Sequence, residues 1–112
     1  MLPSSQRLSR QQVTALVSDP SIRVVFNRIG TLKYRLSTGY ALTVVTGSKH
    51  QKKAVLRNRL RRQLYSLARS YNIENTLAIE GILYVSKQVY DLSFLELKDA
   101  FYALLSKTAK NS

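Results

Sequence analysis

The chain has 112 residues, which suits a single domain (1–112) with its own core, and its 18 lysines and arginines against 6 acidic residues give a net charge of +12. The absence of cysteine excludes disulfides and thiolate metal sites and fits a reducing cytoplasm. No apolar run reaches the roughly eighteen residues of a membrane-spanning helix, and the first residues lack a signal-peptide apolar region. We therefore expect one cytoplasmic domain that has no membrane partner.

The first part of the chain predicts a short helix followed by three strands. Ser9 to Gln12 form a capping box, Leu16 continues an apolar stripe, and Asp19-Pro20 ends the helix because proline disfavours helical geometry in the residue before it. Strands are expected at residues 21–26, 31–36 and 40–46, between turn-forming segments. Their short connections favour antiparallel neighbours.

A long amphipathic helix follows the loop at residues 47–51 and is expected to end near Tyr71. Its apolar residues recur at helical spacing on one arc of the helical wheel, and they are Leu56, Leu60, Leu64, Leu67, Ala68 and Tyr71. Asn58, Arg62 and Arg69 point the other way. We expect the leucines to anchor this helix to a sheet and the arginines to face outward.

The last third predicts one more strand, at Ile82–Val85, and a final helix that begins at the capping box of Ser93 and Glu96. The tail from about residue 106 is expected to fray. The complete order is α-β-β-β-α-β-α. Because each helix supplies one apolar stripe, we expect an α+β two-layer sandwich, with the helices on one face of a four-stranded sheet.

Charge is concentrated in the middle of the chain. No acidic residue and twelve lysines or arginines lie between Pro20 and Ile73. Lys52 and Lys53 lie in or beside the first turn of the long helix, where the macrodipole is already positive, and a bound phosphate would offset that repulsion. A polyanion such as nucleic acid is the expected partner. An anionic membrane would also attract this charge. However, a helix binds a membrane surface through its apolar side, and here we expect that side to be buried in the core.

The run Lys52-Lys53-Ala54-Val55-Leu56-Arg57-Asn58-Arg59-Leu60-Arg61-Arg62 has a particular pattern. A basic residue, alanine and two variable positions precede Arg-Asn-Arg, an apolar residue and two basic residues. This pattern resembles the signature of the protein component of bacterial ribonuclease P. The order of elements, Arg7-Leu8, Arg69 and the amphipathic final helix agree with that family, so the resemblance spans nearly the whole chain.

The chain departs from the family pattern at three places. Gly47 to His50 stands where the family has Ser-Lys-Lys or Ala-Lys-Lys, and it retains only Lys49. Val13 and Val17 replace the aromatic residues usual in the first helix. Tyr65 occupies a position where a basic residue is common.

The resemblance implies a ribonucleoprotein enzyme, the endoribonuclease that removes the 5′ leader of precursor tRNA. The catalyst is then the RNA subunit, which holds most of the Mg²⁺, and no metal or cofactor is assigned to the protein alone. The implied partners are the catalytic RNA and precursor tRNA, without an obligate protein partner. The resemblance also implies a left-handed β-α-β crossover, and a cleft between the first helix and the sheet that holds the single-stranded leader.

Carried onto this sequence, the resemblance and the charge pattern assign RNA contact to Lys49, Lys52, Lys53, Arg57, Asn58, Arg59, Arg61, Arg62 and Arg69. Tyr34 aligns with a family aromatic residue and is the first candidate to stack on the leader. The further cleft candidates are Phe26, Tyr40 and Val13. For each aromatic residue the alternative is ordinary packing in the core.

The sequence shows no catalytic constellation. His50 is the single histidine, and no carboxylate lies near it in sequence to orient it. A ribosomal or other structural RNA-binding protein would explain the charge equally well. A nuclease that acts without RNA has little support, and a DNA-binding helix would lack a recognisable helix-turn-helix partner.

Overall fold

The computed structural model of the chain describes residues 10–37, 39–46, 53–75 and 78–110. Its elements are α1 (Arg10–Val17), β1 (Arg23–Asn27), β2 (Gly30–Leu36), β3 (Ala41–Val45), α2 (Ala54–Asn75), β4 (Ile79–Val85), the 3-10 helix η2 (Lys87–Asp91) and α3 (Phe94–Lys110). The predicted order of helices and strands is confirmed, and η2 is an addition that the sequence pattern did not predict. The helix α3 continues past Ser106 with Thr108 buried, so fraying of the tail stays a prediction.

The four strands of the described chain form one mixed sheet in the order β1-β2-β4-β3. The antiparallel pairing of β1 with β2 confirms the predicted hairpin. The expectation that β2 and β3 are neighbours is wrong, because β4 lies between them, antiparallel to β2 and parallel to β3. A central strand is buried on both faces, and β4 meets this demand with Gly81, Ile82 and Leu83.

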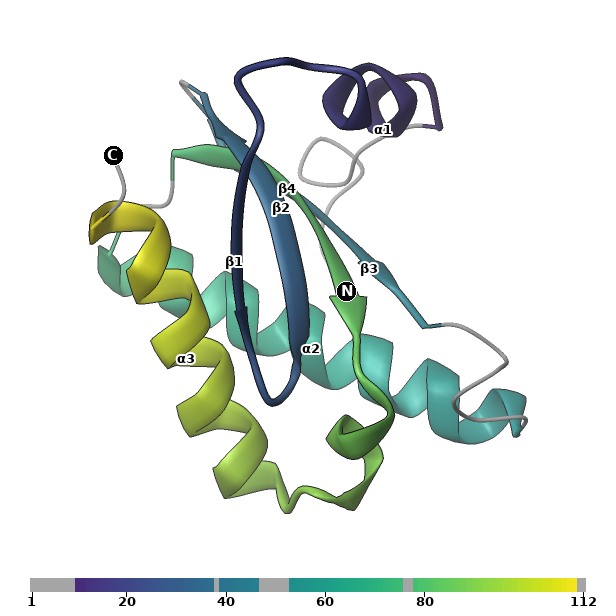
Figure 1. Ribbon diagram of the computed structural model, residues 1–112. Coiled ribbons are helices and arrows are strands. Elements are labelled where there is room, and N and C mark those ends of the chain that lie inside the picture. The colour runs from purple at the N-terminus through teal and green to yellow at the C-terminus, as the bar shows by residue number, and fades with distance from the viewer. Residues whose placement is uncertain (1–9, 38, 47–52, 76–77, 111–112) are drawn as a thin grey trace.

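The helix α2 connects the parallel strands β3 and β4. In Figure 1 it runs behind the sheet while the chain passes from β3 to the neighbouring β4. This path makes the β-α-β unit left-handed, as the resemblance implies, against the usual right-handed preference.

The main core lies between one face of the sheet and the helices α2 and α3. Val25, Leu32, Leu83 and Val44 form one cross-strand row of this face, and all four are buried. The helices add Leu60, Leu64 and Leu67 from α2 and Leu97, Phe101, Leu104 and Leu105 from α3. Where α2 and α3 meet, the rings of Tyr71 and Tyr102 pack edge to face with centroids 5.1 Å apart.

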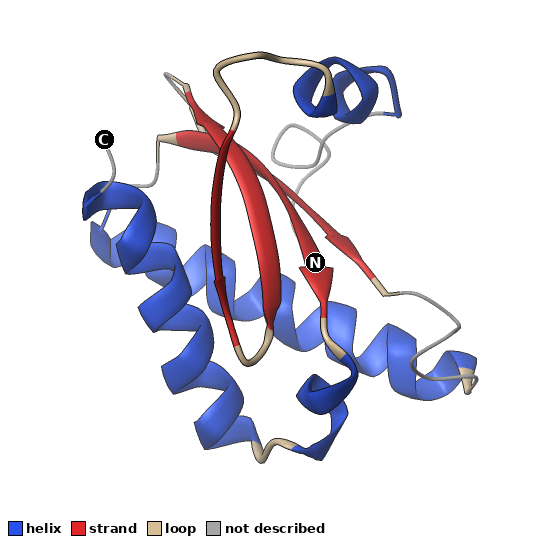
Figure 2. Cartoon of the chain, viewed as in Figure 1, coloured by secondary structure: helices blue, strands red, loops and turns tan. Residues whose placement is uncertain are grey.

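The helix α1 does not join α2 and α3. Figure 2 shows it apart from them, at one end of the sheet. Its buried Leu16 contributes nothing to the main core, and α1 contacts β2 and β4 on the face that carries Ile82. The expectation that all helices cover one face is therefore wrong: an apolar stripe shows that a helix packs, but not against which face.

The hairpin between β1 and β2 turns at a glycine that the fold requires. Gly30 has φ +151°, and a Cβ there would lie 2.1 Å from the backbone oxygen of Tyr84. Beside the turn, the Asn27 side-chain amide donates to the carbonyl of Ala100 at 2.8 Å, and Lys107 Nζ donates to the carbonyl of Phe26 at 2.9 Å. These bonds fix β1 against α3.

Candidate nucleic-acid interface

The two sides of α2 differ as the sequence predicts. Leu60 and Leu64 are buried against the sheet, whereas Asn58, Arg59, Arg62 and Arg69 are exposed, together with Lys53 directly before the helix. We call the exposed residues Asn58, Arg59, Arg62 and Arg69 the basic face. No acidic residue occurs in the first turn of α2 to offset the positive helix end.

Two of the predicted RNA contacts on α2 are less exposed than the basic face. Arg57 and Arg61 are half-buried, and the Arg61 guanidinium donates to the side-chain oxygen of Asn58. Burial raises the pKa of the Tyr90 phenol, and the charges of Arg57 and Arg61 partly counter this rise. These two arginines therefore lie toward η2 as well as toward solvent. Lys49, Lys52 and His50 lie outside the described residues.

Tyr65 explains one departure from the family pattern. Its side chain is buried, and its hydroxyl accepts a hydrogen bond from the backbone N–H of Val44 at 3.0 Å. A lysine at this position would place a charge in the core between α2 and β3. Here the position holds the edge strand against the helix instead of contacting RNA.

The other face of the sheet is only partly covered. Phe26 on β1 is 69% exposed, and Val24 and Val45 on the same face are also exposed. Tyr84 shares the cross-strand row of Phe26 and Val45 and is half-buried, with Lys33 Nζ 5.7 Å from its ring centroid. We call this surface, formed by Val24, Phe26, Lys33, Val45 and Tyr84, the open sheet face.

Only one of the three aromatic cleft candidates belongs to the open sheet face. Phe26 does, but Tyr34 is fully buried on the covered face and Tyr40 is buried as well. In this structure the prediction that Tyr34 stacks on the leader is wrong, and so is the one for Tyr40, because a stacked base needs an accessible ring. Desolvation accordingly raises the pKa of Tyr40. Val13 lies in α1, but its side chain is outside the described part.

Tyr84 was missed, although the sequence contained a signal for it. Residues in a strand alternate between the two faces, so Tyr84 must oppose the buried Leu83 and Val85. The alternation shows that Tyr84 is accessible only once it is known that α2 and α3 cover the face of Leu83 and Val85.

An ionic cluster fixes the end of α1 beside the open sheet face. Arg35 on β2 donates to Asp19 at 2.9 Å and to Glu80 on β4 at 3.3 Å. The Ser21 hydroxyl and backbone N–H also donate to Asp19, at 2.7 and 2.8 Å. Hydrogen bonds from Ser21 and then Arg35 lower the pKa of Asp19 to about 2. The carboxylate stays charged and holds α1 in place at neutral pH.

Two other kinds of site, a metal centre and a membrane-spanning helix, have no counterpart among the described residues. These residues contain no group of three or more histidine, aspartate and glutamate side chains that could hold a metal ion. None of the helices among them is long and apolar enough to cross a membrane.

The fold and the basic face define a class, the small α+β proteins with an exposed arginine-rich helix. A family model described as Ribonuclease P matches residues 2–109, and the chain belongs to this family, as the protein component. It supports 5′ maturation of tRNA within an endoribonuclease whose catalysis resides in the RNA. The family implies partnership with the ribonuclease P RNA and precursor tRNA.

Known structures agree on the fold. A Staphylococcus aureus RNase P protein mutant with defective mRNA degradation activity is 19% identical, with a TM-score of 0.78 over 95% of this chain and 89% of that chain. The Thermotoga maritima RNase P protein is 18% identical, with a TM-score of 0.78 over 90% of this chain and 96% of that one. No curated protein matches the sequence.

Proposed function

We propose that the basic face of α2 docks on the backbone of the ribonuclease P RNA. The observation that carries this proposal is the division of one helix into a buried leucine side and an exposed arginine side, with no acidic residue before Glu74 in its last turn. Arginine presents a planar fork that fits phosphate oxygens in pairs. Lys49, Lys52, Lys53, Arg57 and Arg61 would extend the contact along the helix start and toward η2.

The open sheet face is our proposal for the 5′ leader of precursor tRNA. Single-stranded RNA binds where aromatic rings accept bases and cations accept phosphates. Phe26 and Tyr84 supply exposed and half-exposed rings, and Lys33 supplies a charge between them. Val13 on α1 remains a further candidate for the leader cleft. Exposed apolar residues on a sheet otherwise have no structural reason to stay uncovered.

Two further parts of the proposal concern the Mg²⁺ needed for cleavage and the compartment in which the protein acts. The Mg²⁺ needed for cleavage would be held mainly by the RNA subunit, and the protein would favour its retention by bringing the leader and the RNA together. The cysteine-free composition suits action in the cytoplasm.

Arginine substitutions on α2 test the docking proposal. Arg59→Ala and Arg62→Ala remove exposed charges and should weaken binding to the cognate RNA with little change in stability. If about six phosphates are contacted, the logarithm of affinity should fall with the logarithm of salt at a slope near −4 to −5. Each lost contact should reduce that slope by about one. Ser66→Ala, on the exposed side of the same helix, is the matched control.

An unchanged affinity and slope in both arginine variants would reject the docking face. Reconstitution then tests the activity: the chain with its cognate RNA should cleave precursor tRNA at a Mg²⁺ concentration where the RNA alone is slow. Absence of stimulation, combined with sedimentation on ribosomal particles, would favour the structural RNA-binding alternative. Cleavage by the protein without RNA would reveal a nuclease of another kind.

A further inference from the structure

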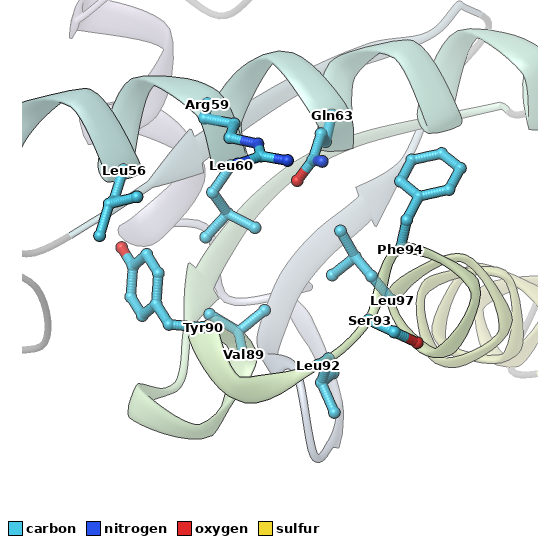
Figure 3. Close-up of a pocket in the computed structure, with 10 residues that line it drawn as sticks. All are labelled: Leu56, Arg59, Leu60, Gln63, Val89, Tyr90, Leu92, Ser93, Phe94 and Leu97. Carbon is cyan, nitrogen blue, oxygen red and sulfur yellow. The ribbon is translucent and has the colours of Figure 1, made fainter.

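A cavity of about 310 Å³ lies beside the basic face, between α2, η2 and the start of α3 (Figure 3). Leu60, Val89 and Leu97 form its buried apolar floor. Arg59 and Gln63 reach its edge from α2, and Phe94 stands at its edge on α3. Arg59 is thus shared between the cavity and the basic face.

The edge of the cavity combines an exposed ring with hydrogen-bonding groups. Phe94 is the first residue of α3 and is 54% exposed, so its ring is accessible to a ligand at the edge of the cavity. Arg59 offers donors only, whereas the amide of Gln63 offers both a donor and an acceptor. The Tyr90 hydroxyl in the cavity wall is buried without a hydrogen-bond partner.

The nearby start of α3 does not act as an anion site. The backbone N–H of Ser93 donates to the Glu96 carboxylate at 3.0 Å, and the backbone N–H of Glu96 donates to the Ser93 hydroxyl at 3.2 Å. Glu96 itself lies 4.0 Å from Arg28. The capping box therefore places the Glu96 carboxylate at the helix end, and its negative charge disfavours a phosphate there.

We infer that the cavity receives one unstacked nucleobase from the RNA that the basic face binds. A base has apolar faces, which suit the leucine floor and the Phe94 ring, and a polar edge, which suits Arg59 and Gln63. The volume lies at the lower end of the roughly 300–1,000 Å³ of small-molecule pockets, which fits a single ring system. The inference rests on the proposed function, because the basic face holds the backbone beside the cavity.

Charge argues for RNA over a second copy of the chain. Two copies that met at this surface would bring two net charges of +12 together, with Arg59 at the contact. An RNA strand would instead neutralise the arginines while one of its bases entered the cavity.

The test compares two neighbouring residues at the start of α3. Phe94→Ala removes the ring at the cavity edge, whereas Leu95→Ala removes a side chain that is 66% exposed and does not line the cavity. Both exposed positions should leave the thermal melting curve nearly unchanged. We expect Phe94→Ala to weaken binding to the cognate RNA about five- to 150-fold, the range for one stacked base, with the salt slope unchanged. Leu95→Ala should bind as the parent chain does.

A polyanion without bases separates stacking from charge. Inorganic polyphosphate should bind the parent chain and Phe94→Ala equally, and Arg62→Ala less well. Gln63→Ala is a second cavity variant and should weaken RNA binding in the same direction as Phe94→Ala. Sedimentation of the free proteins shows whether either cavity variant changes an oligomeric state.

The outcomes distinguish the two proposals. If Phe94→Ala and Gln63→Ala bind RNA as the parent does while Arg62→Ala binds weakly, the nucleobase site is rejected and the docking face stands. Equal losses for RNA and polyphosphate in Phe94→Ala, or a change in its oligomeric state, also reject the nucleobase site. If Arg62→Ala has no effect on RNA binding or its salt slope, the docking proposal itself fails.

Discussion

The two faces of the sheet serve different ends although the same strands build both. The face beneath α2 and α3 is closed, and its rows of Val25, Leu32 and Leu83 are buried. The opposite face is covered by α1 only at one end and leaves Phe26 and Val24 exposed. The comparison teaches that apolar residues on the two faces of one strand can have different roles. On the closed face they stabilise the fold, and on the open sheet face, as we propose, they bind the leader.

The largest effect is expected on the closed face. Leu83→Ala should lower the free energy of unfolding by about 2 to 5 kcal/mol, because it leaves a cavity in the central strand under both helices. Denaturant unfolding measures this loss. Leu36→Ala, on β2 but half-exposed, should change stability by much less. A small loss for Leu83→Ala would mean that the core does not centre on β4.

The next effect concerns the turn that joins the edge strand β1 to its neighbour β2. Gly30→Ala should lower the free energy of unfolding by about 1 to 3 kcal/mol, since a Cβ would collide with the Tyr84 carbonyl in a backbone conformation that favours glycine. Thermal unfolding provides the measurement. Gly39→Ala is the control, because a Cβ there meets nothing within 4 Å. Equal melting temperatures for the two variants would contradict the assigned turn.

On the open sheet face we expect a loss of binding without a loss of stability. Phe26→Ala removes an exposed ring and should weaken binding of a single-stranded leader by about 1 kcal/mol or more, with the unfolding free energy nearly unchanged. Comparing precursor tRNA with and without its leader in the reconstituted enzyme isolates the effect. Val24→Ala, exposed on the same strand and face, should have little influence. A stability loss in Phe26→Ala as large as that of Leu83→Ala would erase the contrast between the two faces.

The smallest effect concerns the ionic cluster that holds α1 over the open sheet face. Because the folded-state pKa of Asp19 is lowered to about 2, its stabilising contribution is present above the usual carboxyl pKa of about 4. That contribution is lost as pH falls from there through about 2. NMR titration of the Leu16 methyl groups should follow this release. In Asp19→Asn the same signals should lose this transition, and a midpoint near pH 4 in the parent chain would contradict the cluster.

Local pattern was sufficient for α2. Its 3.6-residue period places Leu60 and Leu64 on one side and Arg62 and Arg69 on the other, and the structure has the same division. The capping box at Ser93 and Glu96 likewise marked the start of α3 correctly. Both patterns depend on residues within a few positions of one another, so they can be recognised without knowledge of the tertiary structure.

Long-range packing decided what those patterns left open. Alternation in β2 groups Tyr34 with Leu32, but only the position of α2 and α3 decides that this group is covered and that Phe26 is exposed. The cavity joins α2 to η2 and the start of α3, and the strand β4 separates α2 from these two in sequence, so no local motif could predict it.

By itself the sequence determined the order of the main helices and strands, where the positive charge gathers, and which side of the long helix is apolar, because periodicity and charge are properties of neighbouring residues. The tertiary structure alone decided that β4 occupies the centre of the sheet, that α1 packs on the face opposite α2 and α3, and that a cavity lies beside the arginines. These features depend on which distant surfaces bury one another, and that choice is made by the whole chain at once.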